Sequence, residues 1–214
     1  MDAQFWHDRW ASNEIGFHKS DANPLLVQYF DKLSLAKGSR VFLPLCGKTL
    51  DIGWLLSRGY QVAGAELSAV AIKQLFAELG VTPTITKVGA LDHYHAPQLD
   101  LFVGDMFHLT PELLGPVDAV YDRAAIVALP RDMRARYAAH LMTLTAHAPQ
   151  LLISFEYDQQ VMEGPPFSVT TEEIQQHYSK RYDISILTSL DVPGGLKGRC
   201  PATERVYVLR AGRP

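Results

Sequence analysis

The residues best placed for chemistry follow two short apolar runs. The first run, residues 41–43, leads into a turn that contains Pro44 and Gly47, and the second, residues 62–65, ends at Glu66. An amphipathic segment of helix length separates them, so the stretch predicts a strand-helix-strand unit of a parallel sheet. A carboxylate about 20 residues after the first turn is placed to accept hydrogen bonds from both ribose hydroxyls of a nucleotide cofactor. Glu66 is therefore a candidate cofactor-binding residue; the alternative is that it caps the next helix or faces water.

The turn itself restricts the kind of nucleotide. It lacks G-x-G-x-x-G and contains only Gly47. The sequence Gly47-Lys48-Thr49 is similar to the end of a phosphate-binding P-loop, but that motif needs a glycine where Phe42 stands. A nucleoside triphosphate is therefore disfavoured, and a cofactor without a pyrophosphate fits a single-glycine turn better.

Other reactive side chains have simpler interpretations. Cys46 lies in the turn, but no histidine or asparagine accompanies it in a recognisable pattern, so a packed thiol is expected. The eight histidines include no H-x3-H pair. His93 and His95 would share one face of a strand, but a solvated loop is the favoured interpretation. No metal site is predicted.

Strands and helices alternate along the rest of the chain. Helices are predicted at residues 2–12, after Asn23, and at 69–79, 130–147 and 170–178, and strands at 99–103, 117–121 and 150–157. Two closing runs, residues 184–190 and 205–209, lack a crossover helix and predict an antiparallel pair. Arg131, Arg134 and Arg136 are interpreted as a solvated helix face. Residues 82–97 are not assigned to an element, and a short strand or an insertion is considered there. We therefore expect a doubly wound, mostly parallel α/β sheet of about seven strands with a C-terminal antiparallel hairpin.

Length and composition limit the kinds of function that this protein can have. The 214 residues suit a single domain 1–214, with N-terminal helices in residues 1–35 and the sheet core in residues 36–214. A formal net charge of -3 gives no global basic field for nucleic acid or anionic lipid. No apolar stretch approaches membrane-spanning length, and the first residues do not have the pattern of a signal peptide. Two cysteines give no disulfide framework, so a reduced, cytoplasmic setting is expected. No helix shows a sustained heptad, which favours a monomer.

Several stretches resemble the thiopurine S-methyltransferases, a family of class I S-adenosylmethionine-dependent methyltransferases with a Rossmann-like fold. These stretches are FW-x3-W (residues 5–10), GFH (16–18), VFLPLCGKTLD-x2-W (41–54), GYQVAGAELS (59–68), YDRAAIVALP (121–130), SFEYD (154–158) and EGPPF (163–167). Their order and spacing are similar to those of the family, and they extend over most of the chain. The thiopurine substrate class is implied by this resemblance alone. Periodicity and composition indicate only a site for a nucleotide-type cofactor.

The resemblance implies S-adenosylmethionine as the cofactor. It implies that four residues contact it: Trp10 as a cover, Leu45 at the first turn, Glu66 at the ribose hydroxyls and Arg123 near the methionine end and the acceptor. Asp105 stands at the position where many class I enzymes contact the adenine, but no motif of the family supports this match. Phe17 resembles the aromatic residue of an N-terminal helical lid that touches the acceptor.

Residues 190–203 depart most from the family pattern. Acceptor contacts there, including any role of Arg199, and in residues 158–168 stay open.

The expected reaction is in-line methyl transfer to an aromatic or heterocyclic thiol such as a thiopurine. It requires alignment and exclusion of water, without a metal or a dedicated base. The cation of Arg123 would favour the thiolate, or would only bind a ligand, or would pair with Asp122 or Asp105. Selenium or tellurium species are further acceptors to consider for bacterial members. The alternatives are transfer to oxygen, nitrogen or a halide, a nicotinamide-dependent oxidoreductase, and a non-catalytic cofactor-binding protein.

Overall fold

The computed structural model describes residues 3–16 and 19–212, in two compact units, Met1–Ala119 and Val120–Pro214. The organisation into a single domain with an N-terminal lid remains a prediction. In the described residues, no helix is both long enough and apolar enough to span a membrane.

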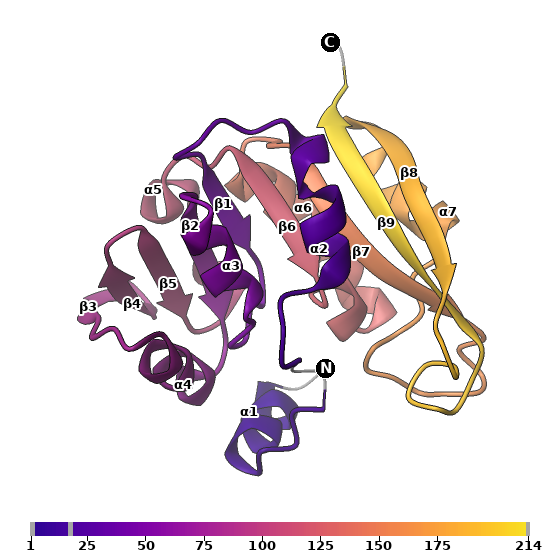
Figure 1. The fold of residues 1–214 in the computed structure, drawn as a ribbon, viewed down its shortest axis with the longest axis horizontal. Coiled ribbons are helices and arrows are strands. Elements are labelled where there is room, and N and C mark those ends of the chain that lie inside the picture. Colours follow the sequence, from indigo (N-terminus) through magenta and orange to yellow (C-terminus); the bar gives the residue numbers. More distant parts are fainter. Residues whose placement is uncertain (1–2, 17–18, 213–214) are drawn as a thin grey trace. The chain divides into compact units, whose positions relative to one another are not determined.

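Unit 1 contains five strands in the order β3-β4-β5-β2-β1 (Figure 1). Their bounds are β1 (Arg40–Leu43), β2 (Gln61–Glu66), β3 (Thr84–Val88), β4 (Leu91–Ala96) and β5 (Leu99–Val103). The pairs β1/β2 and β2/β5 are parallel, whereas β3/β4 and β4/β5 are antiparallel. The predicted strand-helix-strand unit is therefore confirmed as β1-α3-β2, and the carboxyl ends of β1, β2 and β5 lie at one edge.

Unit 1 has five helices in its described residues, and all but the last and shortest were predicted. They are α1 (Ala3–Ala11), α2 (Pro24–Tyr29), α3 (Asp51–Ser57), α4 (Ala69–Leu79) and α5 (Pro111–Leu114), with short 3-10 turns η1 (Phe30–Leu33) and η2 (Met106–His108). Asn23 caps α2, because its Oδ1 accepts from the amide of Leu25 at 2.8 Å. Helix α4 ends at Gly80, whose φ of 68° suits a residue without Cβ. Both α3 and α4 pack on β2.

The unassigned segment 82–97 forms the hairpin β3-β4. The prediction of seven strands was wrong, because the described residues form nine strands. Residues 84–87 are all exposed, so β3 lacks the alternation that reveals a half-buried strand. His93 and His95 lie on β4 rather than in the expected loop.

Unit 2 contains the strand order β6-β7-β9-β8. The bounds are β6 (Ala119–Arg123), which begins at the boundary between the units, β7 (Gln150–Tyr157), β8 (Tyr182–Asp191) and β9 (Ala202–Ala211). Strand β6 is parallel to β7, and β9 is antiparallel to both β7 and β8. The predicted C-terminal antiparallel pair is confirmed, and β6 lies two residues later than the predicted 117–121.

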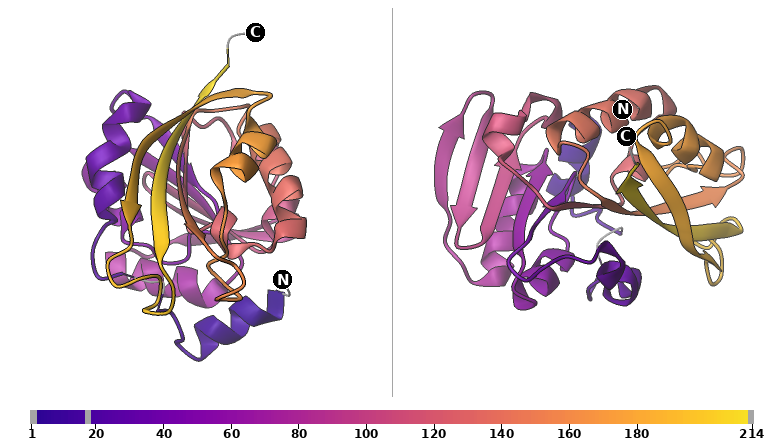
Figure 2. Two further views of the ribbon diagram at one scale, coloured as in Figure 1. Left: turned by 90° about the vertical axis from the view of Figure 1, so that its right-hand side faces the viewer. Right: turned by 90° about the horizontal axis from the view of Figure 1, so that it is seen from above.

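The helices of unit 2 lie side by side on one face of its strands (Figure 2). They are α6 (Arg131–Leu144) and α7 (Thr171–Tyr178), and the 3-10 turn η3 (Ile126–Ala128) precedes them. Arg134 is only 2% exposed and donates to Glu173 Oε2 at 2.8 Å. The interpretation of a solvated arginine face was therefore wrong for Arg134, although Arg131 and Arg136 are exposed.

Candidate functional site

Glu66 joins the two turns that follow β1 and β2. Its Oε2 accepts from the amide of Gly47 at 2.8 Å, and its Oε1 accepts from the amide of Ser68 at 2.8 Å. Ser68 is the N-cap of α4, so the side chain of Glu66 also supports the start of that helix. A carboxylate has about four acceptor positions. The backbone amides around Glu66 therefore do not occupy all of its acceptor positions.

Burial sets the ionisation of Glu66. The residue is 6% exposed, and this burial raises the pKa of its carboxyl. The amides of Ser68, Gly47 and Leu67 act in the opposite direction, because they stabilise the carboxylate. The carboxyl oxygens of Glu66 are thus held by backbone donors in a mostly dry position.

The turn after β1 approaches Trp10 closely. Leu45 and Gly47 have positive φ of 48° and 55°, and a Cβ on Gly47 would lie 3.0 Å from Cζ2 of Trp10. Trp10 is itself 4% exposed. The single glycine is therefore needed both for its backbone conformation and for the space that the indole occupies. This places Leu45, Trp10 and Glu66 around one turn.

The thiol of Cys46 in the same turn is buried. Burial, and then the charge of Glu66, raise the pKa of this thiol well above its ordinary value. The thiolate is the reactive form of cysteine. Cys46 is therefore a packing residue and not a nucleophile.

Asp105 follows β5 at the edge where Glu66 ends β2. The amide of Gly104 donates to the carbonyl oxygen of Glu66 at 2.9 Å, which ties the two strand ends together. Asp105 is exposed, and its Oδ1 accepts from the amide of Phe107 at 2.9 Å as the cap of η2. The structure thus brings Asp105 to the predicted edge, while its contact with an adenine remains a prediction.

Arg123 ends β6 in unit 2. The neighbouring Asp122 is fully buried, and it accepts from the amide of Ile126 at 3.1 Å and from the hydroxyl of Tyr137 at 2.6 Å. No ion pair joins Arg123 to Asp122 in the part of the chain that the structure describes. Arg123 is partly exposed and precedes Ala124, whose φ of 64° turns the chain sharply.

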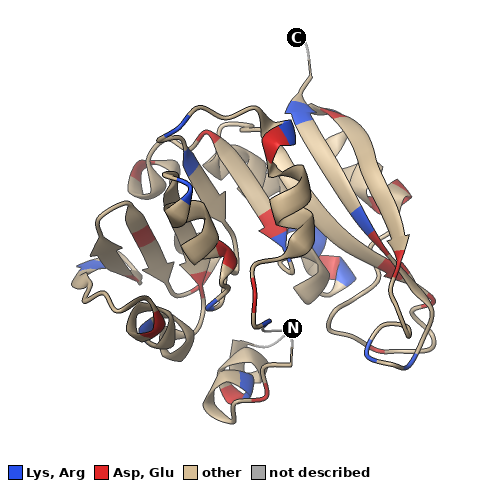
Figure 3. Ribbon diagram, viewed as in Figure 1, with Lys and Arg blue, Asp and Glu red and all other residues tan. Residues whose placement is uncertain are grey.

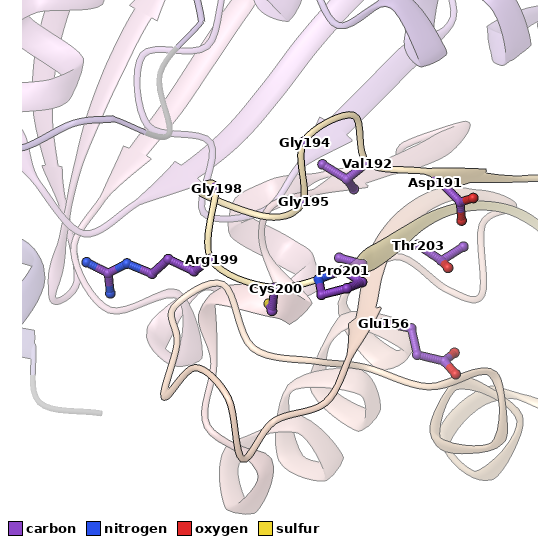
Figure 4. A pocket seen from close by; sticks show the side chains of 11 residues that line it. Glu156, Asp191, Val192, Gly194, Gly195, Gly198, Arg199, Cys200, Pro201 and Thr203 are labelled. Atoms are coloured by element: carbon purple, nitrogen blue, oxygen red, sulfur yellow. The ribbon is translucent and has the colours of Figure 1, made fainter.

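A cavity of about 510 Å³ lies beside the connection between β8 and β9 (Figure 4). Glu156 and Thr203 contribute to its lining from β7 and β9, and Arg199 and Cys200 contribute from the connecting loop. The side chain of Arg199 points away from the other labelled side chains (Figure 4). The negative charge of Glu156 is paired with Arg205.

The two loops left open by the sequence contact each other. Lys197 Nζ donates to the carbonyl oxygen of Pro165 at 2.6 Å, and Met162 of the first loop packs in an apolar cluster with Leu196 of the second. Sequence reasoning missed this pairing because an irregular loop has no periodicity to read. Phe17, the remaining predicted site residue, lies outside the described residues.

Comparisons with known proteins agree with the sequence motifs. Residues 1–210 match the profile of the family described as Thiopurine S-methyltransferase (TPMT). A thiopurine S-methyltransferase of Xanthobacter autotrophicus is 58% identical over 210 residues, covering 98% of this chain and 99% of that protein. One of Gluconobacter oxydans is 47% identical over 206 residues, covering 96% and 94% respectively.

Two solved structures show the fold at low identity. A Burkholderia thailandensis 1,6-didemethyltoxoflavin-N1-methyltransferase, solved with S-adenosylhomocysteine, has a TM-score of 0.66 at 13% identity and covers 98% of this chain and 87% of that one. A TehB-like S-adenosylmethionine-dependent methyltransferase of Corynebacterium glutamicum has a TM-score of 0.57 at 13% identity and covers 98% of each chain. The α/β fold is that of class I methyltransferases, and the chain belongs to the thiopurine S-methyltransferase family.

Proposed function

We propose that this protein transfers the methyl group of S-adenosylmethionine to the sulfur of a small aromatic or heterocyclic thiol, such as a thiopurine. Family membership supports the reaction class. The observation that carries the site assignment is the buried carboxylate of Glu66, which holds the turns after β1 and β2 by two amide hydrogen bonds of 2.8 Å.

The residues of unit 1 fit the cofactor. Glu66 would accept from the ribose hydroxyls with the acceptor positions that the amides leave unused. Leu45 and Trp10 would contact the cofactor beside the single-glycine turn, which suits a cofactor without a pyrophosphate. Asp105 would lie at the adenine. When bound, S-adenosylmethionine supplies a methyl group that is activated by a sulfonium.

The chain's own contribution is alignment and electrostatics. The acceptor thiol would lose its proton to water, and its sulfur would displace S-adenosylhomocysteine in line, so that the sulfur-carbon bond forms as the bond between the methyl carbon and the sulfonium breaks. Arg123 would stabilise the thiolate and orient the acceptor. The buried thiol of Cys46 is unsuited to act as a base. A dedicated base is unnecessary, because aromatic thiols ionise near neutral pH.

The partner would be a small-molecule thiol, with the loops at residues 158–168 and 190–203 and the aromatic ring of Phe17 as candidate acceptor contacts. Selenium or tellurium species are chemically related acceptors. We expect a cytoplasmic monomer that binds no nucleic acid. The net charge of -3 supports the last expectation, as does the interspersion of acidic and basic residues along both units (Figure 3).

The test is transfer of labelled methyl from S-adenosylmethionine to thiosalicylate or a mercaptopurine, with cofactor affinity measured by calorimetry. We expect Glu66→Ala to weaken cofactor binding by about 1–3 kcal/mol, the range for loss of a charged hydrogen-bonding partner. Glu112→Ala, at an exposed position of α5, is the matched control and should bind as the natural protein does. Glu66→Gln keeps the side-chain shape and replaces one acceptor oxygen, so it serves where the alanine variant unfolds.

The outcomes separate the alternatives. Full cofactor affinity in a folded Glu66 variant would remove Glu66 from the site. Transfer to phenols, amines or a halide with none to thiols would move the acceptor from sulfur to another atom. Binding of the cofactor without turnover of any acceptor would indicate a non-catalytic protein.

A further inference from the structure

Two imidazoles and one carboxylate converge on the surface of unit 1, away from the proposed cofactor site. His93 Nε2 and His95 Nδ1 each lie 2.8 Å from the same oxygen, Asp100 Oδ1. The three ligand atoms lie within 4.8 Å of one another. Imidazole nitrogen and carboxylate oxygen are common ligands of zinc.

The register of the antiparallel strands brings these residues together. His95 of β4 is the direct partner of Asp100 of β5, and His93 is the partner of Phe102. Directly paired residues of antiparallel strands lie on one face of the sheet, as do residues two apart in one strand. The cluster therefore stands on two hydrogen-bonded strands rather than on a loop.

Neighbouring side chains fix the orientation of the ligands. The ring of His93 stacks on Phe102 with centroids 4.7 Å apart and planes at 8°. Arg40 Nη2 donates to the second oxygen of Asp100 at 2.9 Å, while Arg40 Nη1 donates to the carbonyl oxygen of Leu114 at 2.5 Å. Such outer contacts orient the ligands of metal sites. The cation of Arg40 opposes a metal ion, so an affinity below that of four-ligand structural sites is expected.

We propose that His93 Nε2, His95 Nδ1 and Asp100 Oδ1 bind a zinc ion, with water completing a tetrahedral coordination. Zinc-ligand bonds of about 2.0–2.1 Å separate tetrahedral ligands by about 3.3 Å. The present separations of 2.8 Å are those of hydrogen bonds. Binding therefore replaces the proton of each hydrogen bond by the metal and moves the ligands apart by about half an ångström.

The place of the cluster in the sheet indicates a structural role. Asp100 is the second residue of β5, and Arg40 is the first residue of β1. Both lie toward the amino ends of parallel strands, whereas Leu45, Glu66 and Asp105 lie at or beyond the carboxyl ends. The zinc would join β4 to β5 and so strengthen the attachment of the β3-β4 hairpin, whose strand β3 is exposed, without taking part in methyl transfer.

Calorimetric titration of zinc chloride into chelator-treated full-length protein without an affinity tag tests the proposal. We expect one zinc per chain with micromolar affinity. His95→Gln, at the more exposed histidine, should weaken this binding at least tenfold, and Asp100→Asn should do the same. His108→Gln removes an exposed histidine of the same unit and should leave the affinity unchanged.

A thermal readout is independent of catalysis, in which zinc would interfere by binding the thiol acceptor. Zinc at about 100 times the Kd of the natural protein should raise the Tm by about 5–10 °C in the natural protein and in His108→Gln, and by at most about half as much in His95→Gln. Absence of binding to the natural protein would overturn the proposal. Equal binding by His95→Gln, a variant with little packing to lose, would overturn it as well.

Discussion

Asp122 makes the stability of this chain depend on pH. Its carboxyl is fully buried, and burial raises its pKa from 3.8 to about 6, although the hydroxyl of Tyr137 and the amides of Ile126 and Ala125 favour the charged form. The folded state therefore holds this proton more tightly than the unfolded state does. The contribution of Asp122 to the free energy of unfolding is largest below pH 3.8 and is lost as the pH rises to about 6.

The expected size of this effect is about 3 kcal/mol, because the two pKa values differ by about two and each pH unit corresponds to about 1.4 kcal/mol. Urea denaturation between pH 3.8 and about 6 measures this effect as the difference in free energy of unfolding between the natural protein and Asp122→Asn. The natural protein should lose stability relative to the variant as the pH rises. Asp132→Asn, on an exposed position of α6, is the control, and a parallel course for all three proteins would show that Asp122 does not titrate there.

Replacement of Arg123 tests how the protein acts on the acceptor thiol. It makes no ion pair with Asp122 within the described residues, so the guanidinium is not committed to that neighbour. Arg123→Ala should lower turnover more than it lowers cofactor affinity, since its charge is proposed to act on the thiolate. Single-turnover kinetics beside calorimetry distinguish the two effects. Arg131→Ala serves as control, and a parallel fall of turnover and affinity would assign Arg123 to cofactor binding alone.

At the scale of elements, replacement by alanine is expected to have opposite effects on stability at two glycines of unit 1. A Cβ on Gly64 in β2 would lie 2.8 Å from Cδ2 of Leu101 and 3.0 Å from Sγ of Cys46. A Cβ on Gly53 in α3 would have its nearest such neighbour at 3.7 Å, Cδ2 of Leu79. Strand β2 is therefore closely packed at Gly64, whereas α3 has space at Gly53.

Gly64→Ala should destabilise the protein by about 1–3 kcal/mol through overpacking. Gly53→Ala should stabilise it by about 0.4–1 kcal/mol, because alanine loses less conformational entropy in a helix. Urea denaturation at constant pH measures both. A stability of Gly64→Ala equal to that of Gly53→Ala would mean that β2 can shift to accept the methyl group.

At the scale of the whole chain, charge and apolar surface favour a monomer. The formal net charge is -3, and the exposed large apolar side chains are spread over elements of both units. Sedimentation velocity over a wide concentration range should show one species with the mass of one chain, 23.8 kDa. Added duplex DNA should sediment unchanged at low salt. A dimer that persists on dilution, or comigration with DNA, would contradict these expectations.

The sequence by itself determined the elements that depend on residues close to one another in the chain. The apolar runs at residues 41–43 and 62–65 became β1 and β2, and the cap at Asn23 formed as predicted, because each depends on neighbours close in sequence. The lack of a crossover helix was sufficient to predict the β8-β9 pair. The spacing of Glu66 placed its carboxylate at the strand ends, and the family motifs indicated the reaction.

The tertiary structure alone decided features that depend on contacts distant in sequence. Strand β3 is exposed and is recognised only by its pairing with β4. Arg134 is buried because Glu173 reaches it from another helix. The cluster of His93, His95 and Asp100 depends on the register of two strands, which a pattern of residues does not specify. In each case the deciding energy comes from a partner that local periodicity cannot identify.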